Sequence, residues 1–315
     1  MTARGWALFA AMCVIWGIPY LLIKVAVGGM TPATLVFLRT AVGGLLLLPL
    51  SLRRGSLRSL GPSWRVITVY TVIEVALPWW LLSDAERRLS SSLSGLLIAA
   101  VPLTGVVIAR LAGDRDRVDA RRLAGLLVGL AGVAVLLGFD VGSGDIGAVA
   151  EIGLVTVCYA AGPLLIARKL SALPADGVVT ASLILTTAAY APLSLTQLPA
   201  AMPSTRVLAA IAALAVVCTA IAFLVYFALI AEVGPLRATV ITYVNPAVAV
   251  LLGVTILGER FSVGTALGFA LILGGSFVAT QRARTPAPAS FAPVEAQVVA
   301  SPALAQPDAM REDRS

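Results

Sequence analysis

The sequence predicts an all-α integral membrane protein of about ten transmembrane helices, arranged as two inverted five-helix repeats. Three observations lead to that prediction: an apolar composition, ten apolar runs of spanning length, and a weak match between the two halves. Of the 315 residues, 59% are hydrophobic and only 12% are charged, and the mean hydropathy is +0.97. A soluble domain carries about 25% charged residues, and its outside must meet water. The composition therefore fits a lipid bilayer as the solvent.

Ten apolar runs follow one another along the chain, and each is close to the ~20 residues that a membrane-spanning helix needs. The predicted spans are 5–27, 33–50, 65–83, 91–111, 122–139, 148–168, 178–198, 207–231, 236–257 and 262–281. The shortest joins are Asp84–Ser90 and Glu232–Pro235. Both carry charges or a proline, so we expect a tight turn at each. The first run is longer than the apolar core of a signal peptide, so it is predicted to be a retained helix.

These runs give the expected domain organisation. Residues 1–140 are predicted to form a first five-helix repeat and residues 141–282 a second, inverted one. Residues 283–315 are rich in Ala and Pro and contain few large apolar residues. Such a segment cannot bury enough apolar surface to fold, so we expect a disordered cytoplasmic tail.

Positive charges in the loops predict the orientation, because Lys and Arg concentrate on the cytoplasmic side of a membrane. With a cytoplasmic N-terminus, the opposite side receives only Arg87, Arg88, Arg206 and Arg260. The cytoplasmic side receives Arg4, Arg53, Arg54, Arg58, Arg65, Arg110, Arg115, Arg117, Arg121, Arg122, Arg168, Lys169, Arg237, Arg282 and Arg284. Ten spans return the C-terminus to the cytoplasm. We therefore expect a multi-pass protein of the inner (plasma) membrane with both termini cytoplasmic.

The two halves of the chain match at a nearly constant offset of 143 or 144 residues. The matched pairs are Pro19 with Pro163, Lys24 with Arg168, Pro49 with Pro192, Pro102 with Pro246, Asp116 with Glu259, Gly125 with Gly268 and Gly132 with Gly275. A repeat with an odd number of spans inserts its second copy upside down. Inverted repeats around a midplane site are a recurrent design of secondary transporters. The repeat thus indicates a transporter.

Composition also argues against several function classes. The net charge of +7 comes from arginines in short loops, which is typical of membrane topology rather than of nucleic-acid binding. The chain has no histidine, so it lacks the base of a serine protease and the commonest metal ligand. Its cysteines (Cys13, Cys158 and Cys218) lie singly inside apolar runs and fit small buried hydrophobes. We expect no enzyme activity, metal, cofactor or nucleic-acid partner.

Short motifs in a fixed order resemble a known family. They are Trp16-Gly17, Arg39, Ala76–Trp79, Ala85-Glu86, Ser91-Ser92, Ala99–Leu103, Asn245-Pro246 and Gly258–Arg260, followed by Gly268 and Gly275. In these residues the sequence resembles the drug/metabolite transporter superfamily and, within it, the EamA-type transporters. The resemblance covers nearly all of Gly5 to Thr280. The first half departs from it, with Gly113–Arg117 where the family has Gly-Glu-Arg.

The resemblance implies two five-helix units in inverted order with both termini in the cytoplasm. It implies a central cavity lined mainly by helices 1, 3, 4, 6, 8 and 9, with helices 5 and 10 as scaffold. Family members mostly export amino acids, other metabolites or toxic compounds, often against a proton gradient. The predicted partners are therefore a small-molecule substrate, the lipid bilayer and, in a coupled mechanism, protons.

Glu74 is the sharpest candidate site residue, because it lies in the middle of an apolar run. A charge at the bilayer centre costs at least about 2.5–3.5 kcal/mol, so the side chain should face protein or water. Such a site disfavours a charged carboxyl, which suits proton binding and release. The alternative is a carboxyl bonded to a neighbouring helix. We expect Glu74 to bind substrate or a proton.

Two basic residues also lie inside apolar runs. Arg39 is predicted to pair with Glu74 or to bind an acidic group of the substrate, and snorkelling to the interface is its alternative. Lys24 is near a helix end, where snorkelling is the favoured interpretation.

Aromatic and proline residues complete the candidate site. Trp16, Tyr243 and Asn245 are deep enough to line a cavity, although aromatic residues also anchor helices at interfaces. The prolines inside spans should each kink the helix and shape or gate the cavity, unless the kinks serve only packing. They are Pro19, Pro78, Pro102, Pro163 and Pro246.

The predicted function is a secondary transporter that exports small metabolites, such as amino acids or related compounds, by alternating access. No Gly-x-x-x-x-Gly-Lys-[Ser/Thr] motif is present, so ATP is not the direct energy source. Proton coupling and passive transport both stay open, as do a channel and a drug efflux protein. A membrane-embedded enzyme is the least favoured class. Monomer and homodimer also stay open.

Overall fold

The computed structural model describes residues 2–111, 120–140, 145–234 and 238–280, and all regular structure in these ranges is helical. Within them, ten helices are long and apolar enough to cross a membrane, which confirms the predicted number of spans. They are Ala3–Ala26, Pro32–Arg53, Arg58–Arg88, Ser91–Ile108, Ala120–Gly138, Ile146–Leu170, Ala175–Thr196, Thr205–Val233, Val240–Leu257 and Val263–Thr280. The predicted tail and Asp116 lie outside the described residues.

The first five spans contain ten helical elements. They are α1 (Ala3–Ile15), α2 (Pro19–Ala26), α3 (Pro32–Arg53), η1 (Arg58–Ser63), α4 (Trp64–Thr71), η2 (Val72–Ala76), α5 (Leu77–Arg88), α6 (Ser91–Ile98), α7 (Val101–Leu111) and α8 (Ala120–Asp140). The first, third and fourth spans are built from more than one element, whereas α3 and α8 are continuous. The interrupted spans are those that the resemblance assigned to the cavity.

The last five spans follow a related plan. Their elements are α9 (Ile146–Leu165), η3 (Ile166–Leu170), α10 (Ala175–Thr196), α11 (Thr205–Ala215), η4 (Val216–Ile221), α12 (Ala222–Val233), η5 (Thr239–Tyr243), α14 (Asn245–Leu257) and α15 (Val263–Thr280). The sixth, eighth and ninth spans are composite, and α10 and α15 are continuous. The composite and continuous spans thus occur in the same order in both halves.

Each of the five singled-out prolines lies beside a change of helix geometry. Proline fits the first turn of a helix, where its missing N–H is not needed. Pro19, Pro78, Pro102 and Pro246 stand in the first turns of α2, α5, α7 and α14, and irregular segments precede all four. Pro163 lies inside α9, shortly before the π-helical η3. Their gating role stays a prediction.

Two π-helical segments occupy equivalent places in the third and eighth spans. η2 begins at Val72 and η4 begins at Val216, which is an offset of 144 residues. A π-helical turn adds a residue to the helix and often marks a functional site. η4 contains no proline, so no residue type in its sequence predicts it. The pair shows that the repeat extends to local backbone geometry.

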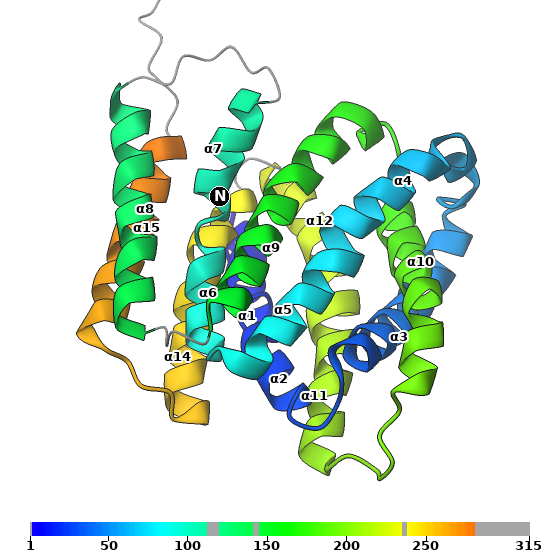
Figure 1. Ribbon diagram of the computed structural model, residues 1–315. Helices are drawn as coiled ribbons and strands as arrows, with labels where there is room; N and C mark the ends of the chain where they lie inside the picture. Colours follow the sequence, from blue (N-terminus) through cyan, green and yellow to red (C-terminus); the bar gives the residue numbers. More distant parts are fainter. Residues whose placement is uncertain (1, 112–119, 141–144, 235–237, 281–315) are drawn as a thin grey trace, which may run out of the picture. The chain divides into compact units, whose positions relative to one another are not determined.

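Contacts between the halves follow the pattern of an inverted repeat. Equivalent spans pack against each other in three cases: α3 with α10, α6 with α14, and α8 with α15. Two further contacts are repeat equivalents of each other. The first span packs on α11 and α12 of the eighth span, and α5 of the third span packs on α9 of the sixth. Figure 1 shows α8 beside α15, and α3 beside α10. The predicted arrangement of two five-helix repeats fits this packing.

Glycines bring α8 and α15 into backbone contact. A Cβ atom on Gly125 would lie 2.5 Å from the Ala279 nitrogen, and one on Gly132 would lie 2.7 Å from the Ile272 nitrogen. A Cβ atom on Gly275 would overlap the backbone of Gly129. Small residues let membrane helices approach this closely. These contacts fit the scaffold role expected for the fifth and tenth spans.

The third span is longer than predicted, because Asp84–Arg88 continues α5 instead of forming a loop. Only Leu89 and Ser90 separate α5 from α6. Ala85 and Glu86 are buried in this last turn, while Arg87 and Arg88 are exposed and pair with Asp84 three and four residues earlier. Such pairs stabilise a helix end. The amphipathic turn therefore stays helical despite its charges.

Candidate transport site

Glu74 lies in the π-helical segment η2, near the middle of the third span. Its residue is half-buried, and its Oε2 atom is buried without a hydrogen-bond partner. The carboxyl group packs directly on Gly162 of α9, where a Cβ atom would overlap Oε2. The position therefore depends on a glycine one residue before Pro163. An unpaired carboxyl at this depth is costly.

Tyrosines from three helices are near enough to interact electrostatically with this carboxyl group. Tyr70 of α4, Tyr159 of α9 and Tyr226 of α12 lie within electrostatic range of Glu74, as does Cys158 of α9. None of them donates a hydrogen bond to Oε2 in the described structure. Glu74 thus has polar neighbours, and its Oε2 atom is available to bind a proton or a ligand.

Arg39 does not form the predicted ion pair with Glu74. Its Nε donates a hydrogen bond to Thr219 Oγ1 at 2.9 Å, and its guanidinium carbon lies 3.7 Å from the centre of the Trp79 ring. The residue is only 7% exposed. Its Nη groups make no hydrogen bond with described residues, and they are not fully buried. Arg39 is therefore oriented by η4 and α5, with donors left over for another group.

Trp16 belongs to an aromatic cluster at the break between α1 and α2. Its ring centre lies 4.7 Å from that of Tyr226 and 6.2 Å from that of Phe223, and Phe223 stacks on Phe227 at 6.1 Å. All four side chains are partly accessible. The structure thus brings Trp16 and Glu74 into one neighbourhood, because Tyr226 is close to both.

Asn245 and Tyr243 have structural partners. When the Asn245 amide is oriented to satisfy both ends, its nitrogen donates to the carbonyls of Cys13 (3.1 Å) and Ile241 (3.0 Å). Both carbonyls belong to interrupted helices, which need such partners inside a membrane. The Tyr243 hydroxyl pairs with Thr280 Oγ1 at 2.8 Å. Substrate contacts of these two residues remain a prediction.

Glu86 was expected in a loop, but it is the most deeply buried acid among the described residues. It is 0% exposed, and neither carboxyl oxygen has a hydrogen-bond partner. Hydropathy could not reveal it, because its segment contains three other charged residues, Asp84, Arg87 and Arg88. The usable sign was the apolar spacing of Leu82, Ala85 and Leu89, which places the acid beside a buried helix face.

Lys24 has specific partners at the same end of α5, and its expected snorkelling to the interface stays a prediction. Its Nζ donates to the backbone oxygens of Glu86 (2.6 Å) and Leu89 (2.7 Å). A cation on the last carbonyls of a helix satisfies groups that have no partner inside the helix. Lys24 therefore joins α2 to the C-terminal end of α5.

Glu259 forms a second link between the halves at this end. Its carboxylate accepts hydrogen bonds from the backbone N–H groups of Ser91 (2.7 Å) and Ser92 (2.9 Å), and from the Ser92 hydroxyl. A carboxylate at a helix N-terminus is favoured by the helix dipole. Gly253 leaves the space, because a Cβ atom there would overlap Glu259 and Ser92. The acid of Gly258–Arg260 thus caps α6.

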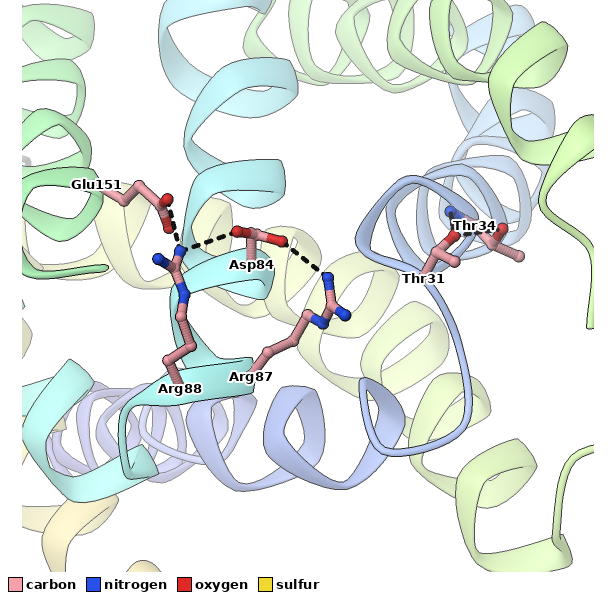
Figure 2. A network of polar contacts seen from close by, with 6 residues as sticks. All are labelled: Thr31, Thr34, Asp84, Arg87, Arg88 and Glu151. Carbon is pink, nitrogen blue, oxygen red and sulfur yellow. Dashed lines mark hydrogen bonds and ion pairs between the residues drawn. The ribbon is translucent and has the colours of Figure 1, made fainter. Parts of the chain in front are cut away.

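Figure 2 shows the polar network at the surface of this region. Arg88 bonds Asp84 at 2.9 Å and Glu151 of α9 at 2.6 Å, and Arg87 bonds Asp84 at 3.3 Å. Thr31 and Thr34, which begin α3, form a separate pair in the same view. The network ties α5 to α9 and neutralises both arginines. Among the described residues, no group of acidic and cysteine side chains is placed to hold a metal ion.

The arrangement of interrupted helices around a buried acid agrees with the comparison to known families. A model of the EamA-like transporter family matches residues 3–138 and 148–281. The chain belongs to the EamA-like transporter family. Each matched range covers five of the ten spans, so the fold is the two-repeat fold of these transporters.

Curated relatives point the same way. The chain is 31% identical over 263 residues to the uncharacterized inner membrane transporter YedA of Escherichia coli strain K12, covering 81% of this chain and 83% of the relative. Transporters of the same name from two further Escherichia coli strains match equally. A solved crystal structure of a protein, 23% identical, matches with a TM-score of 0.63 over 89% of this chain and 98% of that chain. The EamA-like family membership makes this chain a membrane transporter.

Proposed function

We propose that this EamA-like protein is a secondary transporter of the inner membrane that exports small metabolites, such as amino acids or related compounds. The observation that carries the proposal is the Glu74 carboxyl group, unpaired at Oε2 in the middle of a span. The residue lies in a π-helical segment, and its carboxyl group packs on Gly162. A carboxyl in this setting can exchange a proton or bind an ammonium group.

Other residues of the candidate site have complementary roles in this proposal. Arg39 binds an acidic group of the substrate through its unengaged Nη donors, and Trp16 packs against the rest of the molecule. Tyr243 and Asn245 hold the ninth span in place and contribute to the site through it. A substrate with one amine and one carboxylate, as in an amino acid, fits both charges.

Alternating access is the proposed mechanism because the composite spans occur in repeat-related pairs. Inverted-repeat transporters move one unit against the other around a midplane site. In this proposal the segments beside Pro19, Pro78, Pro102, Pro163 and Pro246 act as hinges. With no nucleotide-binding motif in the sequence, a proton gradient is the proposed energy source.

The proposed orientation has both termini in the cytoplasm. Arg87 and Arg88 lie on the outer side in that orientation, and both are paired with acids. The outer side has four basic residues against fifteen in the cytoplasmic loops, which supports the positive-inside assignment. The similarity to an inner membrane transporter supports the choice of membrane.

Replacement of the central carboxyl tests the proposal. Cells that overproduce the protein are screened for resistance to toxic metabolites and compared with cells that carry Glu74→Gln. The variant should lose the resistance, because Gln neither ionises nor pairs with a cation. Glu232→Gln is the matched control, since Glu232 lies at an exposed helix end and bonds only Thr2. A Glu74→Gln protein with the wild-type rate and pH dependence would contradict the proposed role.

A drug efflux protein is the second candidate, favoured by the accessible aromatic cluster of Trp16, Phe223, Tyr226 and Phe227. Aromatic faces bind flat and cationic compounds. Resistance to such compounds without resistance to amino acid analogues would support it. Uptake into inverted vesicles separates both candidates from a passive channel, because a transporter saturates with substrate and a channel gives linear flux.

A further inference from the structure

A second acid, Glu86, lies near the end of α5 in surroundings unlike those of Glu74. It is completely buried, and neither carboxyl oxygen has a partner among the described residues. Burial of an ionised carboxylate without a partner is costly, so the site as it stands suits the protonated acid. Glu259, at the same end of the spans, contrasts with it because three hydrogen bonds satisfy its carboxylate.

Charged and titratable groups approach Glu86 from several packed elements. Lys24 and Tyr20 come from α2, Arg39 from α3 and Glu259 from the turn after α14. On α9, Tyr159 lies within range of Tyr20 and Arg39, while Glu151 is paired with Arg88. α6 contributes only serine hydroxyls and amides at its N-terminus. Lys24 is the cation whose position is tied most closely to Glu86, through the backbone of the same residue.

Lys24 also lines a cavity of about 270 Å³ that opens at the surface. Its other lining residues are Val25, Gly28, Arg206, Val207 and Leu257. Lys24 therefore both lines the cavity and bonds the backbone of the residue that carries the buried acid. No ion pair joins Lys24 to the Glu86 carboxyl in the described structure, because the Nζ donors are directed to the Glu86 and Leu89 carbonyls.

We propose that Glu86 is a second proton-binding residue, reached through this cavity, and that Lys24 is its counter-ion when the proton leaves. The proton passes from a carboxyl oxygen to water in the cavity and returns by the same route. Lys24 then moves from the two carbonyls to the carboxylate. That movement releases the end of α5 and the short Leu89-Ser90 connection. The role in coupling rests on the proposed transport function, whereas the protonation itself does not.

Infrared difference spectroscopy on the purified full-length protein tests the site without a substrate. A pH step should change the C=O bands of protonated carboxyl groups, and one band, distinct from that of Glu74, should disappear in Glu86→Gln and persist in Glu74→Gln. Loss of the band only in Glu74→Gln, or a band that no pH step changes, would overturn the proposal.

Lys24 variants provide an independent measurement if Glu86→Gln does not fold. Lys24→Met removes the cation that stabilises the carboxylate, so the midpoint of the band should move to higher pH by about one unit or more. Lys24→Arg keeps the charge and should leave the midpoint near its wild-type value. A midpoint that is identical in both variants would refute the counter-ion role.

Transport assays then separate this inference from the proposed function. With the cytoplasmic pH held constant, Glu86→Gln should abolish the dependence of export on external pH, and Glu232→Gln should retain it. A Glu86→Gln protein that keeps this dependence would refute the coupling role of Glu86. If Glu86 titrates in the infrared experiment while the wild-type protein exports no metabolite, the proton site stands and the proposed function fails.

Discussion

At the scale of single residues, three acids have three different surroundings. Glu259 is held by the N-terminus of α6, Glu74 rests on Gly162 with one oxygen unpaired, and Glu86 has no partner at either oxygen. A fully bonded carboxylate is stabilised by its donors. An unpaired one keeps its capacity to bind. The pairing state, more than burial alone, distinguishes the cap from the two candidate proton sites.

Gly162→Ala tests the floor of the Glu74 site. The added Cβ would overlap Oε2, so the carboxyl must move and transport should fall at least tenfold, since a 1 Å misplacement can cost about 100-fold. Gly153→Ala on the same helix is the control, because no atom lies within 4 Å of its Cβ position. Export assays should separate the two variants, while thermal unfolding in detergent shows both folded. Equal transport by both would disprove the contact's importance.

Thr219→Val tests the orientation of Arg39. The hydroxyl accepts the Nε hydrogen bond and itself donates to the Leu214 carbonyl. Its loss leaves a buried donor unpaired and should destabilise the protein by about 1–3 kcal/mol. Thr255→Val is the matched control, because its exposed hydroxyl bonds only the Leu251 carbonyl of its own helix. Denaturation midpoints of both variants provide the measurement, and similar midpoints would contradict the prediction.

At the scale of helices, hydropathy predicted the ten spans because bilayer thickness fixes their length. It also singled out Glu74, since a charge inside a long apolar run is conspicuous. The burial of Glu86 was not predicted, because charges near a span end look the same in a loop and in an amphipathic last turn. The partners of Lys24 and Asn245 could not be predicted, because they lie on helices far away in sequence. π-Helical η4 had no signal in composition.

Gly275→Ala tests the packing of α15 on α8. Its Cβ would overlap the backbone of Gly129, which cannot move aside as a side chain would. We expect a loss of about 1–3 kcal/mol from overpacking. Gly274→Ala, one residue earlier, has open space and should gain up to about 1 kcal/mol from helix propensity. Thermal unfolding of the two neighbours should move in opposite directions, and a parallel change would argue against the close contact.

At the scale of the whole molecule, the two matched halves meet through equivalent contacts. Gly125 contacts Gly275, and Gly132 contacts Gly268. At the offset of 143 residues Gly125 corresponds to Gly268 and Gly132 to Gly275, so the two contacts are repeat equivalents of each other. Among these contacts, the continuous helices pair with each other, α3 with α10 and α8 with α15, and the interrupted α6 pairs with α14. Continuous and interrupted spans therefore keep to partners of their own kind in these equivalent contacts.

Cysteine labelling tests the proposed orientation. The native cysteines are buried, so an impermeant maleimide should react with little of the parent protein. Ala201→Cys, in the connection after α10, should be labelled on intact cells. Gly61→Cys, in the connection before α4, should be labelled only after the membrane is opened. The reverse pattern would invert the topology, and the two positions serve as controls for each other.

The glycine contact between α8 and α15 has a consequence for how this sequence can vary. At Gly125, Gly132 and Gly275 the nearest atoms to an added Cβ include backbone, and every other amino acid has at least that one carbon. No conservative replacement exists at these positions. Glu74, Arg39 and Trp16 have side chains that others can replace, whereas these glycines cannot be replaced without moving the backbone of the facing helix.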